Sequence, residues 1–410
     1  MIIKNIGELV GIVPEGVLRK QGAEMAETGV LKDAWIAIED GRIAGFGKMA
    51  DLPDGEVDEP VEPTAIDAAG GMVMPAFCDS HTHVVYAGSR DGEFLDKING
   101  LSYEEIASRG GGILNSADLL HETTEDELYR QSMERVREMM AKGTGAIEIK
   151  SGYGLNPADE LKMLRVIRRI RESVPALVKS TFLGAHAVGR GYTHEGYVQA
   201  VIDMMPQVAE LADFVDVFCD DGFFSVDDTD RILTAGAACD LRPKIHANEL
   251  AVSGGVQVGV KHGALSVDHL ERTTEAEIDA LRGSVTMPTM LPGSSFFLGI
   301  PYGRAKAFID AGLGIALASD YNPGSSPSGD MRFIMALACI RMRLTPVQAL
   351  NALTLNAAYA MGLSDVTGSI TPGKRADLIL THPGWTLTKL PYTYQTPFIR
   401  QVFLGGQVVK

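Results

Sequence analysis

The sequence contains few cysteines, and none of them are paired at a metal-binding spacing. Four of the 410 residues are cysteine, and they are scattered without a C-x-x-C motif, at Cys78, Cys219, Cys239 and Cys339. Isolated cysteines argue against a disulfide framework and against a thiolate metal site, and they fit a reducing compartment. The sequence therefore predicts a cytoplasmic protein.

Basic residues and long hydrophobic runs are also scarce. The chain has 37 Lys and Arg against 53 Asp and Glu, a net charge of −16, which disfavours nucleic acid and anionic membranes as partners. No apolar stretch reaches the roughly 20 residues that cross a bilayer. The first residues, "MIIKNIGELV", lack the basic and then apolar pattern of a secretory signal. A small anionic substrate stays possible, because it needs only one or two local arginines.

A phosphate-binding glycine loop is missing as well. The stretch "SRGGGIL" has neither the G-K-[ST] ending nor the G-x-G-x-x-G pattern, and it predicts a flexible loop. A doubly wound α/β sheet would usually carry such a motif, so its absence disfavours that architecture.

The middle of the chain alternates between apolar runs typical of strands and amphipathic helical patterns. The clearest helical patterns cover 125–143 and 158–174, with apolar residues at i, i+3 or i+4, and i+7. The eight strand-like runs are 73–83, 145–151, 179–186, 214–220, 243–249, 265–270, 284–290 and 314–320. Eight strands alternating with helices predict an α/β fold, a (β/α)8 TIM barrel, which we expect to span 74–364.

Both ends of the chain are rich in strand patterns. "AWIAIEDGRIAGFGK" predicts a hairpin around Asp40-Gly41, and "IRQVFLGGQVVK" predicts another on Gly405-Gly406. Because chain termini often lie close together, we expect residues 1–73 plus 365–410 to form one small β-sandwich domain.

Histidine and acidic residues collect where the strand runs end. The residues concerned are His81, His83, His186, His246, Glu249, Asp268, His269 and Asp320. Active sites of such barrels form at the carboxyl ends of the strands, where a purely structural strand would carry apolar residues. Two residues apart on a strand, His81 and His83 point to the same face, although alone they could equally be a solvated strand end. Several neutral imidazoles with one carboxylate favour a metal site with a position left open for water.

The other histidines lie in loop, turn or helix-start contexts, or in the terminal β region, and we interpret them as structural or solvated: His121, His194, His262 and His382. Lys150 ends the second run. Some barrel hydrolases bridge two metals with a modified lysine, but that lysine would lie near the middle of the strand order. The fourth run has none, so we predict one metal, and we interpret Cys219 on that run as a packing residue.

The pattern of H-x-H on the first strand, His on the fifth and sixth, and Asp on the eighth resembles the metal-dependent amidohydrolase superfamily. Within it, several stretches resemble the imidazolonepropionases: "DSHTHVVYAGSRDGEF", "SYEEIASRGGGI", "IEIKSGYGL", "FLGAHAV", "HANEL" and "ASDYNPGSSPS". These stretches extend over essentially the whole predicted barrel, so the combination is more specific than H-x-H alone.

The resemblance implies hydrolysis of 4-imidazolone-5-propanoate to N-formimino-L-glutamate in histidine degradation, by a homodimer. It implies one divalent or trivalent metal ion, zinc or iron, and we expect its ligands to be His81, His83, His246 and Asp320. The expected substrate contacts are Arg90, Tyr103, Tyr153, His186, Glu249, Asn322, Gly324 and Ser325. Backbone N–H groups and hydroxyls of "YNPGSSPS" are expected to face a carboxylate. The alternative for Arg90 is an ion pair with Asp91 or Glu93.

We assign the proton shuttle to Glu249, the ligand-and-base role to Asp320, and polarisation of the substrate carbonyl to His269. Glu249 has an alternative role, a rim hydrogen bond that only orients His246. Two other functions stay open: a nucleobase deaminase of the same superfamily, which would not need Arg90, and a non-catalytic scaffold, which would usually have lost its metal ligands.

Overall fold

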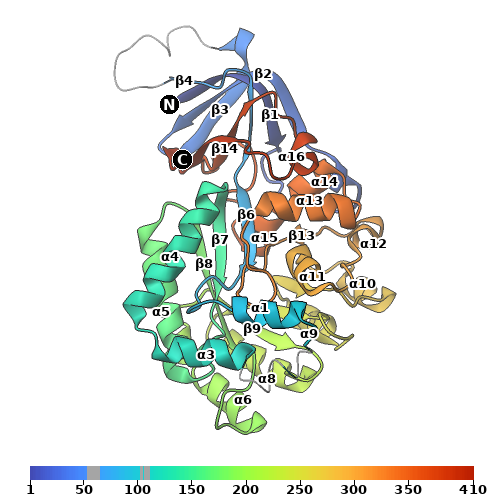
Figure 1. Ribbon diagram of the computed structural model, residues 1–410. Coiled ribbons are helices and arrows are strands. Elements are labelled where there is room, and N and C mark those ends of the chain that lie inside the picture. Colours follow the sequence, from blue (N-terminus) through green and yellow to red (C-terminus); the bar gives the residue numbers. More distant parts are fainter. Residues whose placement is uncertain (53–64, 102–104, 106–110) are drawn as a thin grey trace.

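Two eight-stranded β-sheets organise the computed structural model, which describes residues 1–52, 65–101, 105 and 111–410. One sheet combines strands from both ends of the chain in the order β16-β15-β14-β5-β1-β2-β3, with β4 paired to β1. The other runs β13-β12-β11-β10-β9-β8-β7-β6 and is parallel throughout. Figure 1 shows both termini in the first sheet, at one end of the molecule.

The terminal sheet confirms the predicted β domain built from both chain ends. Its strands are β1 (Ile2–Ile12), β2 (Gly29–Glu39), β3 (Arg42–Lys48), β4 (Ala65–Asp67), β5 (Gly71–Pro75), β14 (Leu378–Pro383), β15 (Ile399–Leu404) and β16 (Gln407–Val408). Both predicted hairpins are present. Their central residues have positive φ, 47° and 74° at Asp40-Gly41 and 56° and 75° at Gly405-Gly406, as the tight turn between twisted strands requires.

The parallel sheet confirms the predicted barrel, with one strand in each of the eight runs. Its strands are β6 (Phe77–Thr82), β7 (Thr144–Lys150), β8 (Leu177–Ala185), β9 (Phe214–Cys219), β10 (Arg242–Ala247), β11 (Ser266–His269), β12 (Met287–Met290) and β13 (Ala316–Leu317). The N–H of Asp320 donates to the carbonyl of His81 at 3.0 Å, and that of His83 donates to Tyr321 at 2.9 Å. These bonds join the first strand to the segment after the eighth.

The helices surround the barrel, and the candidate site lies at the carboxyl ends of its strands. They are α1 (Asp91–Ile98), α3 (Ile113–Glu122), α4 (Glu125–Ala141), α5 (Pro157–Ser173), α6 (His194–Asp203), α7 (Met205–Val208), α8 (Val226–Ala237), α9 (Gly255–Lys261), α10 (Glu275–Leu281), α11 (Pro292–Leu298), α12 (Ala305–Asp310), α13 (Met331–Arg341), α14 (Pro346–Leu353), α15 (Leu355–Ala360) and α16 (Lys389–Tyr392), with short 3-10 turns at Gly22–Ala26 and Met49–Asp51. Within the described residues, none of them has both the length and the hydropathy to cross a membrane.

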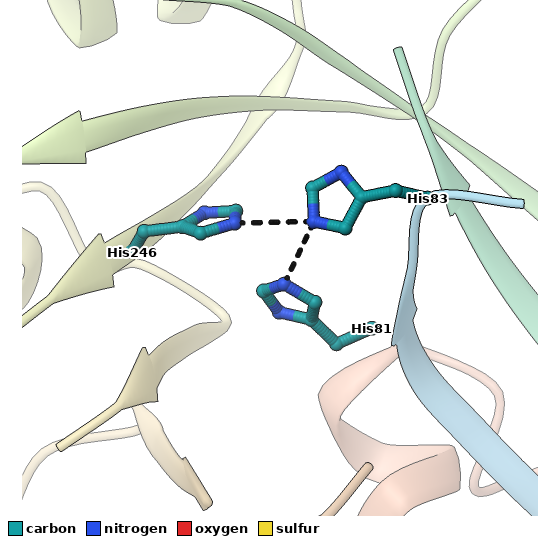
Figure 2. Close-up of side chains that lie close together, drawn as sticks. All are labelled: His81, His83 and His246. Carbon is teal, nitrogen blue, oxygen red and sulfur yellow. Dashed lines mark hydrogen bonds between the residues drawn. The ribbon is translucent and has the colours of Figure 1, made fainter. Parts of the chain in front are cut away.

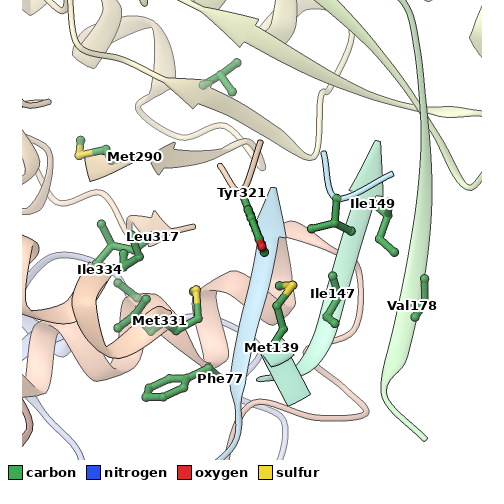
Figure 3. Packing of buried hydrophobic residues seen from close by; sticks show 14 of the residues in the cluster. Phe77, Met139, Ile147, Ile149, Val178, Met290, Leu317, Tyr321, Met331 and Ile334 are labelled. Carbon is green, nitrogen blue, oxygen red and sulfur yellow. The ribbon is translucent and has the colours of Figure 1, made fainter. Parts of the chain in front are cut away.

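The two clearest helical patterns of the sequence correspond to α4 and α5 in the structure. The side chains of Thr124 and Asn156 cap them by accepting hydrogen bonds from N–H groups of the first turn. Their apolar faces pack on the barrel, as Figure 3 shows for Met139 of α4 beside Ile147 of β7.

The first predicted strand run is divided between the two sheets. β5 pairs in the terminal sheet, and β6 begins two residues later in the barrel. Ala76 marks the crossing: its N–H donates to Asp377 at 2.9 Å, while the next N–H, of Phe77, donates to Gly143 at 2.9 Å. The expectation of a single barrel strand over 73–83 is therefore wrong, and Pro75, directly before the crossing, was the local signal that the run is divided. The boundaries 73/74 and 364/365 stay predictions.

Candidate active site

Three histidine side chains converge at the carboxyl edge of the barrel (Figure 2). His81 is the penultimate residue of β6, His83 is the first residue after that strand, and His246 comes from β10. The Nε2 atoms of His81 and His83 are 3.2 Å apart, and those of His83 and His246 are 3.4 Å apart. All three rings are buried, so the sequence-predicted ligands meet at one point.

Carboxylates behind two of these rings fix which nitrogen faces the centre. His81 Nδ1 is 2.7 Å from Asp268 Oδ2, and His246 Nδ1 is 3.0 Å from Asp216 Oδ2. Burial lowers the pKa of His246 to about 3, and that of His81 well below its usual value, so both rings are neutral. With the Nδ1–H of His81 directed at Asp268 and the Nδ1 of His246 beside Asp216, the Nε2 of each ring turns a lone pair toward the shared centre. Facing lone pairs repel one another unless a cation lies between them, so this donor set fits a metal ion.

Asp320 supplies a carboxylate to the same centre. Its Oδ1 is 3.5 Å from Nε2 of both His81 and His83. Its φ of 54° is rare for a residue with a side chain, and such strain concentrates at functional sites. Burial raises the pKa of this carboxyl to about 6. Three imidazoles and one carboxylate thus lie within reach of a single ion.

His269 lies among carboxylates beside this cluster. Its Nε2 is 3.6 Å from Glu249 Oε2, and its Nδ1 is 3.4 Å from Glu271 Oε2. Burial lowers the pKa of His269, but the two carboxylates outweigh burial and hold it well above the usual value. Burial raises the pKa of Glu249 to about 7. An imidazole and a carboxyl whose pKa values are both raised therefore lie side by side. His81, His269 and Asp320 are also close enough together to share an ion.

A cavity of about 280 Å³ opens over the cluster, which it reaches through His83, His246, His269 and Asp320. Every expected substrate contact among the described residues lines it: Arg90, Tyr153, His186, Glu249, Asn322, Gly324 and Ser325. Tyr103 falls outside the described residues. Lys97 adds a second cation, and Phe218 and Phe223 contribute an apolar wall. The cavity thus combines the predicted metal site with positive charge.

Arg90 forms an ion pair with Glu93 and also lines the cavity, so both arrangements considered from the sequence are present. Its Nε and Nη2 lie 2.9 and 2.7 Å from Glu93 Oε2, so the ion-pair alternative is present. The guanidinium also lies against Gly324 at the cavity, where an added Cβ would be 2.3 Å from Arg90 Nη1. Glu93 therefore holds one side of the guanidinium while Nη1 stays outside that pair.

His186 presents a hydrogen-bond acceptor to the cavity. Its Nδ1 is 3.0 Å from the carbonyl of Gly152, to which it donates, and burial lowers its pKa to about 4. In the neutral ring, Nε2 is then an acceptor. Glu160 orders the same loop by accepting hydrogen bonds from the N–H groups of Gly152, Gly154 and Leu155 at 2.7–3.1 Å. Sequence reasoning missed Glu160, which sits in the first turn of α5.

The turn after Asp320 differs from expectation in one respect. The N–H groups of Gly324 and Ser325 both donate to Asn322 Oδ1, each at 2.8 Å. An asparagine that folds back on its own turn uses these donors, so they are not directed at a ligand. The Ser325 hydroxyl instead faces the cluster of histidines and Asp320, because it lies 3.3 Å from Asp320 Oδ2.

Known proteins resemble this chain along its whole length. Residues 72–409 match the Amidohydrolase family. The chain is 52% identical over 413 aligned positions to the imidazolonepropionase of Flavobacterium johnsoniae, covering 100% of this chain and 99% of that protein. Identity to the imidazolonepropionase of Geobacillus kaustophilus is 38%, with 100% and 97% covered. The chain belongs to the imidazolonepropionase family.

Solved structures agree on the fold. A triazine hydrolase variant has a TM-score of 0.76 at 15% identity, covering 99% of this chain and 94% of that one. A guanine deaminase from C. acetobutylicum has a TM-score of 0.72 at 16% identity, covering 100% and 99%. An adenosine deaminase from Xanthomonas campestris, solved with bound zinc, has a TM-score of 0.70 at 17% identity, covering 99% and 92%. This member of the imidazolonepropionase family thus shares its fold with the triazine hydrolase and the two deaminases.

Sequence reasoning missed a set of charged side chains beneath the histidines of this imidazolonepropionase-family site. Glu148, Lys150, Asp216 and Lys244 are all buried in the barrel interior. Lys150, whose role the sequence left open, contacts carboxylates there. A signal existed: Glu148 and Lys150, like Lys244 and His246, are two residues apart on apolar strands and so share a face.

The four remaining histidines lie outside the cavity. Three pair with aspartates on the helical layer: His121 with Asp159, His194 with Asp228 and His262 with Asp230, at 2.7–2.9 Å. His382 is exposed near the end of β14. Their interpretation as structural residues stays a prediction.

Proposed function

We propose that this chain hydrolyses the ring amide C–N bond of 4-imidazolone-5-propanoate to give N-formimino-L-glutamate, a step of L-histidine degradation. The observation that carries the proposal is one cavity that joins three converging histidines and Asp320 to Arg90. Full-length relatives named imidazolonepropionase support the choice of this substrate over others of the superfamily.

We assign one metal ion to His81, His83, His246 and Asp320, with His269 left for the substrate. The ion would supply a nucleophile from water at neutral pH. An ensemble of three imidazoles and a carboxylate suits zinc and iron alike, and elemental analysis of the purified protein decides between them.

Proton transfer is assigned to the two carboxylates beside the cluster. Asp320 lies at the ligand nitrogens and is the base that first receives a proton from water. Glu249, with a pKa raised to about 7 by burial, carries a proton to the ring nitrogen as the C–N bond breaks. His269, held protonated between Glu249 and Glu271, donates to the carbonyl oxygen on which negative charge develops.

Arg90 and Lys97 are assigned to the propanoate group. Guanidinium and carboxylate form paired, charge-assisted hydrogen bonds, and Arg90 Nη1 is outside its contact with Glu93. The neutral His186, whose Nε2 accepts hydrogen bonds, suits a ring N–H of the imidazolone.

The test is an assay of the purified enzyme with 4-imidazolone-5-propanoate, in which the ring absorbance falls as the ring opens. Guanine serves as the competing substrate. Rapid loss of imidazolone absorbance without guanine turnover supports the proposal, whereas turnover of guanine alone would replace it with a deaminase. The cytoplasmic location and the homodimer remain predictions, and sedimentation analysis checks the homodimer.

A further inference from the structure

The barrel interior beneath the three histidines contains five charged side chains with no exposed surface: Glu148, Lys150, Asp216, Lys244 and Asp268. Buried charge is costly unless it is paired, so each of these groups needs its partners. None of the five lines the cavity. Their role must therefore be sought in what they do to the residues above them.

Lys150 touches the two carboxylates that face metal-ligand histidines. Its Nζ donates to Asp216 Oδ2 at 2.8 Å and lies 3.7 Å from Asp268 Oδ2. The same two oxygens lie 3.0 Å from His246 Nδ1 and 2.7 Å from His81 Nδ1. The ammonium group of Lys150 thus lies between the carboxylate that faces His81 of β6 and the carboxylate that faces His246 of β10.

Asp216 contacts the backbone of His246 as well as its ring. Its Oδ1 accepts the backbone N–H of His246 at 3.1 Å, so both the strand and the ring of this histidine depend on one carboxylate. Without Lys150, the carboxylates of Asp216 and Asp268 would share a dry interior without the ammonium between them. They would repel each other and move apart, and would then hold the rings of His81 and His246 less firmly.

We propose that Lys150 is a positioning residue for the metal ion, because it fixes the two carboxylates that orient His81 and His246. The proposal rests on the metal site assigned under the proposed function. It also gives this lysine a role other than that of a ligand. Residues that orient metal ligands commonly change metal affinity by about 10–100-fold when they are lost.

Lys244 offers a matched control within the same cluster. Its Nζ pairs with Glu148 and donates to the carbonyls of Ser80 and Ala360 at 3.0 and 3.2 Å. Asp268 Oδ2 is 3.9 Å away, and although Lys244 and Asp216 are neighbours across β10 and β9, no ion pair joins them among the described residues. Replacing Lys244 therefore removes an equally buried ammonium without releasing the carboxylate that orients His246.

The experiment compares wild type, Lys150→Met and Lys244→Met. Zinc dissociation constants are measured by competition with a chelator, and the visible spectrum of the cobalt(II) form reports ligand geometry. We expect Lys150→Met to weaken zinc binding about 10–100-fold and to shift the cobalt spectrum. Lys244→Met should lose clearly less zinc affinity than Lys150→Met, because it leaves the ion pair between Lys150 and Asp216 intact, even though both variants unfold at lower temperature. Unchanged zinc affinity in Lys150→Met, or an equal loss in the two variants, would overturn the proposal.

If Lys150→Met does not fold, Lys150→Gln takes its place. The glutamine keeps a hydrogen-bond donor but removes the charge that pairs with Asp216, and it leaves both carboxylates that face His246 and His81 unchanged. Weaker zinc binding with a shifted cobalt spectrum supports the inference, and wild-type behaviour refutes it. A wild-type protein that binds no zinc, iron or cobalt stoichiometrically would instead refute the proposed metal site itself.

Discussion

The terminal sheet and the barrel have equal numbers of strands, yet they bury different side chains. The terminal sheet packs around a cluster made only of Ala, Val, Ile, Leu and Phe, including Ile36 and Phe403. The barrel interior holds Lys150 and Lys244 with three carboxylates. Apolar burial stabilises a fold without direction, whereas buried ion pairs add little stability but fix orientation. The comparison teaches that the charges buried in the barrel interior serve the site, whereas the apolar cluster of the terminal sheet serves the fold.

The largest effect should follow from removing a ligand histidine at the top of the barrel. His246→Ala should lose metal and activity together, with kcat down by more than ~10³, because enzymatic rate enhancements of ~10⁶ or more depend on the intact site. Metal analysis and the ring-opening assay measure both quantities. Full metal occupancy in this variant would exclude His246 as a ligand.

The next effect tests whether a buried carboxyl near the ligands acts on protons or only on geometry. Glu249→Gln keeps the size of the side chain but cannot carry a proton, so kcat should fall by about 10²–10⁴ with metal retained and KM little changed. Steady-state kinetics and metal analysis on the same preparation measure this. Near-normal kcat would move the shuttle to Asp320.

The third effect concerns a charged side chain at the cavity, that of Arg90. Arg90→Ala should weaken substrate binding by about 2–4 kcal/mol, as expected when one member of a desolvated charge pair is lost. KM is the readout, and Arg130→Ala is the control, since Arg130 pairs with Glu127 and Glu134 on the exposed face of α4. An unchanged KM in Arg90→Ala would leave Arg90 as the partner of Glu93 alone.

The smallest effect is expected in the terminal sheet. Ile36→Val removes one buried methylene from a fully buried side chain and should lower the free energy of unfolding by about 0.5–1.5 kcal/mol. Chemical denaturation measures that change. Zinc affinity, KM and kcat should stay at wild-type values, and a shift in any of them would show that the two sheets are not separable in function.

The sequence predicted elements with strong periodicity and residues with distinctive chemistry. α4, α5 and both hairpins follow from local patterns, and His81, His83, His246 and Asp320 stood out because ionisable residues at strand ends are unusual. The change of sheet at Ala76 was harder to predict, because both halves of the run are buried and Pro75 is its local signal.

Contacts between distant strands were harder to predict. Lys150 and Asp216 lie on β7 and β9, and nothing within either strand states that they pair. The Arg90 ion pair with Glu93 lay within reach of sequence reasoning because both residues lie in one turn of helix. The hydrogen bonds of Asn322 depend on the exact shape of its turn, so the N–H groups of Gly324 and Ser325 were assigned to the ligand instead.

The crossing at Ala76 also has a consequence for the order of events during synthesis. β5 leads directly into the strand that carries His81, but its partner β14 lies roughly 300 residues later in the chain. At translation rates of about 5–20 residues per second, β5 waits roughly 15–60 s for that partner to be made. β5, which leads into the first strand of the barrel, is thus paired early with β1 and only late with β14. A ribosome that stops before β14 would release a chain that contains every ligand histidine but lacks the second of the two strands that pair with β5.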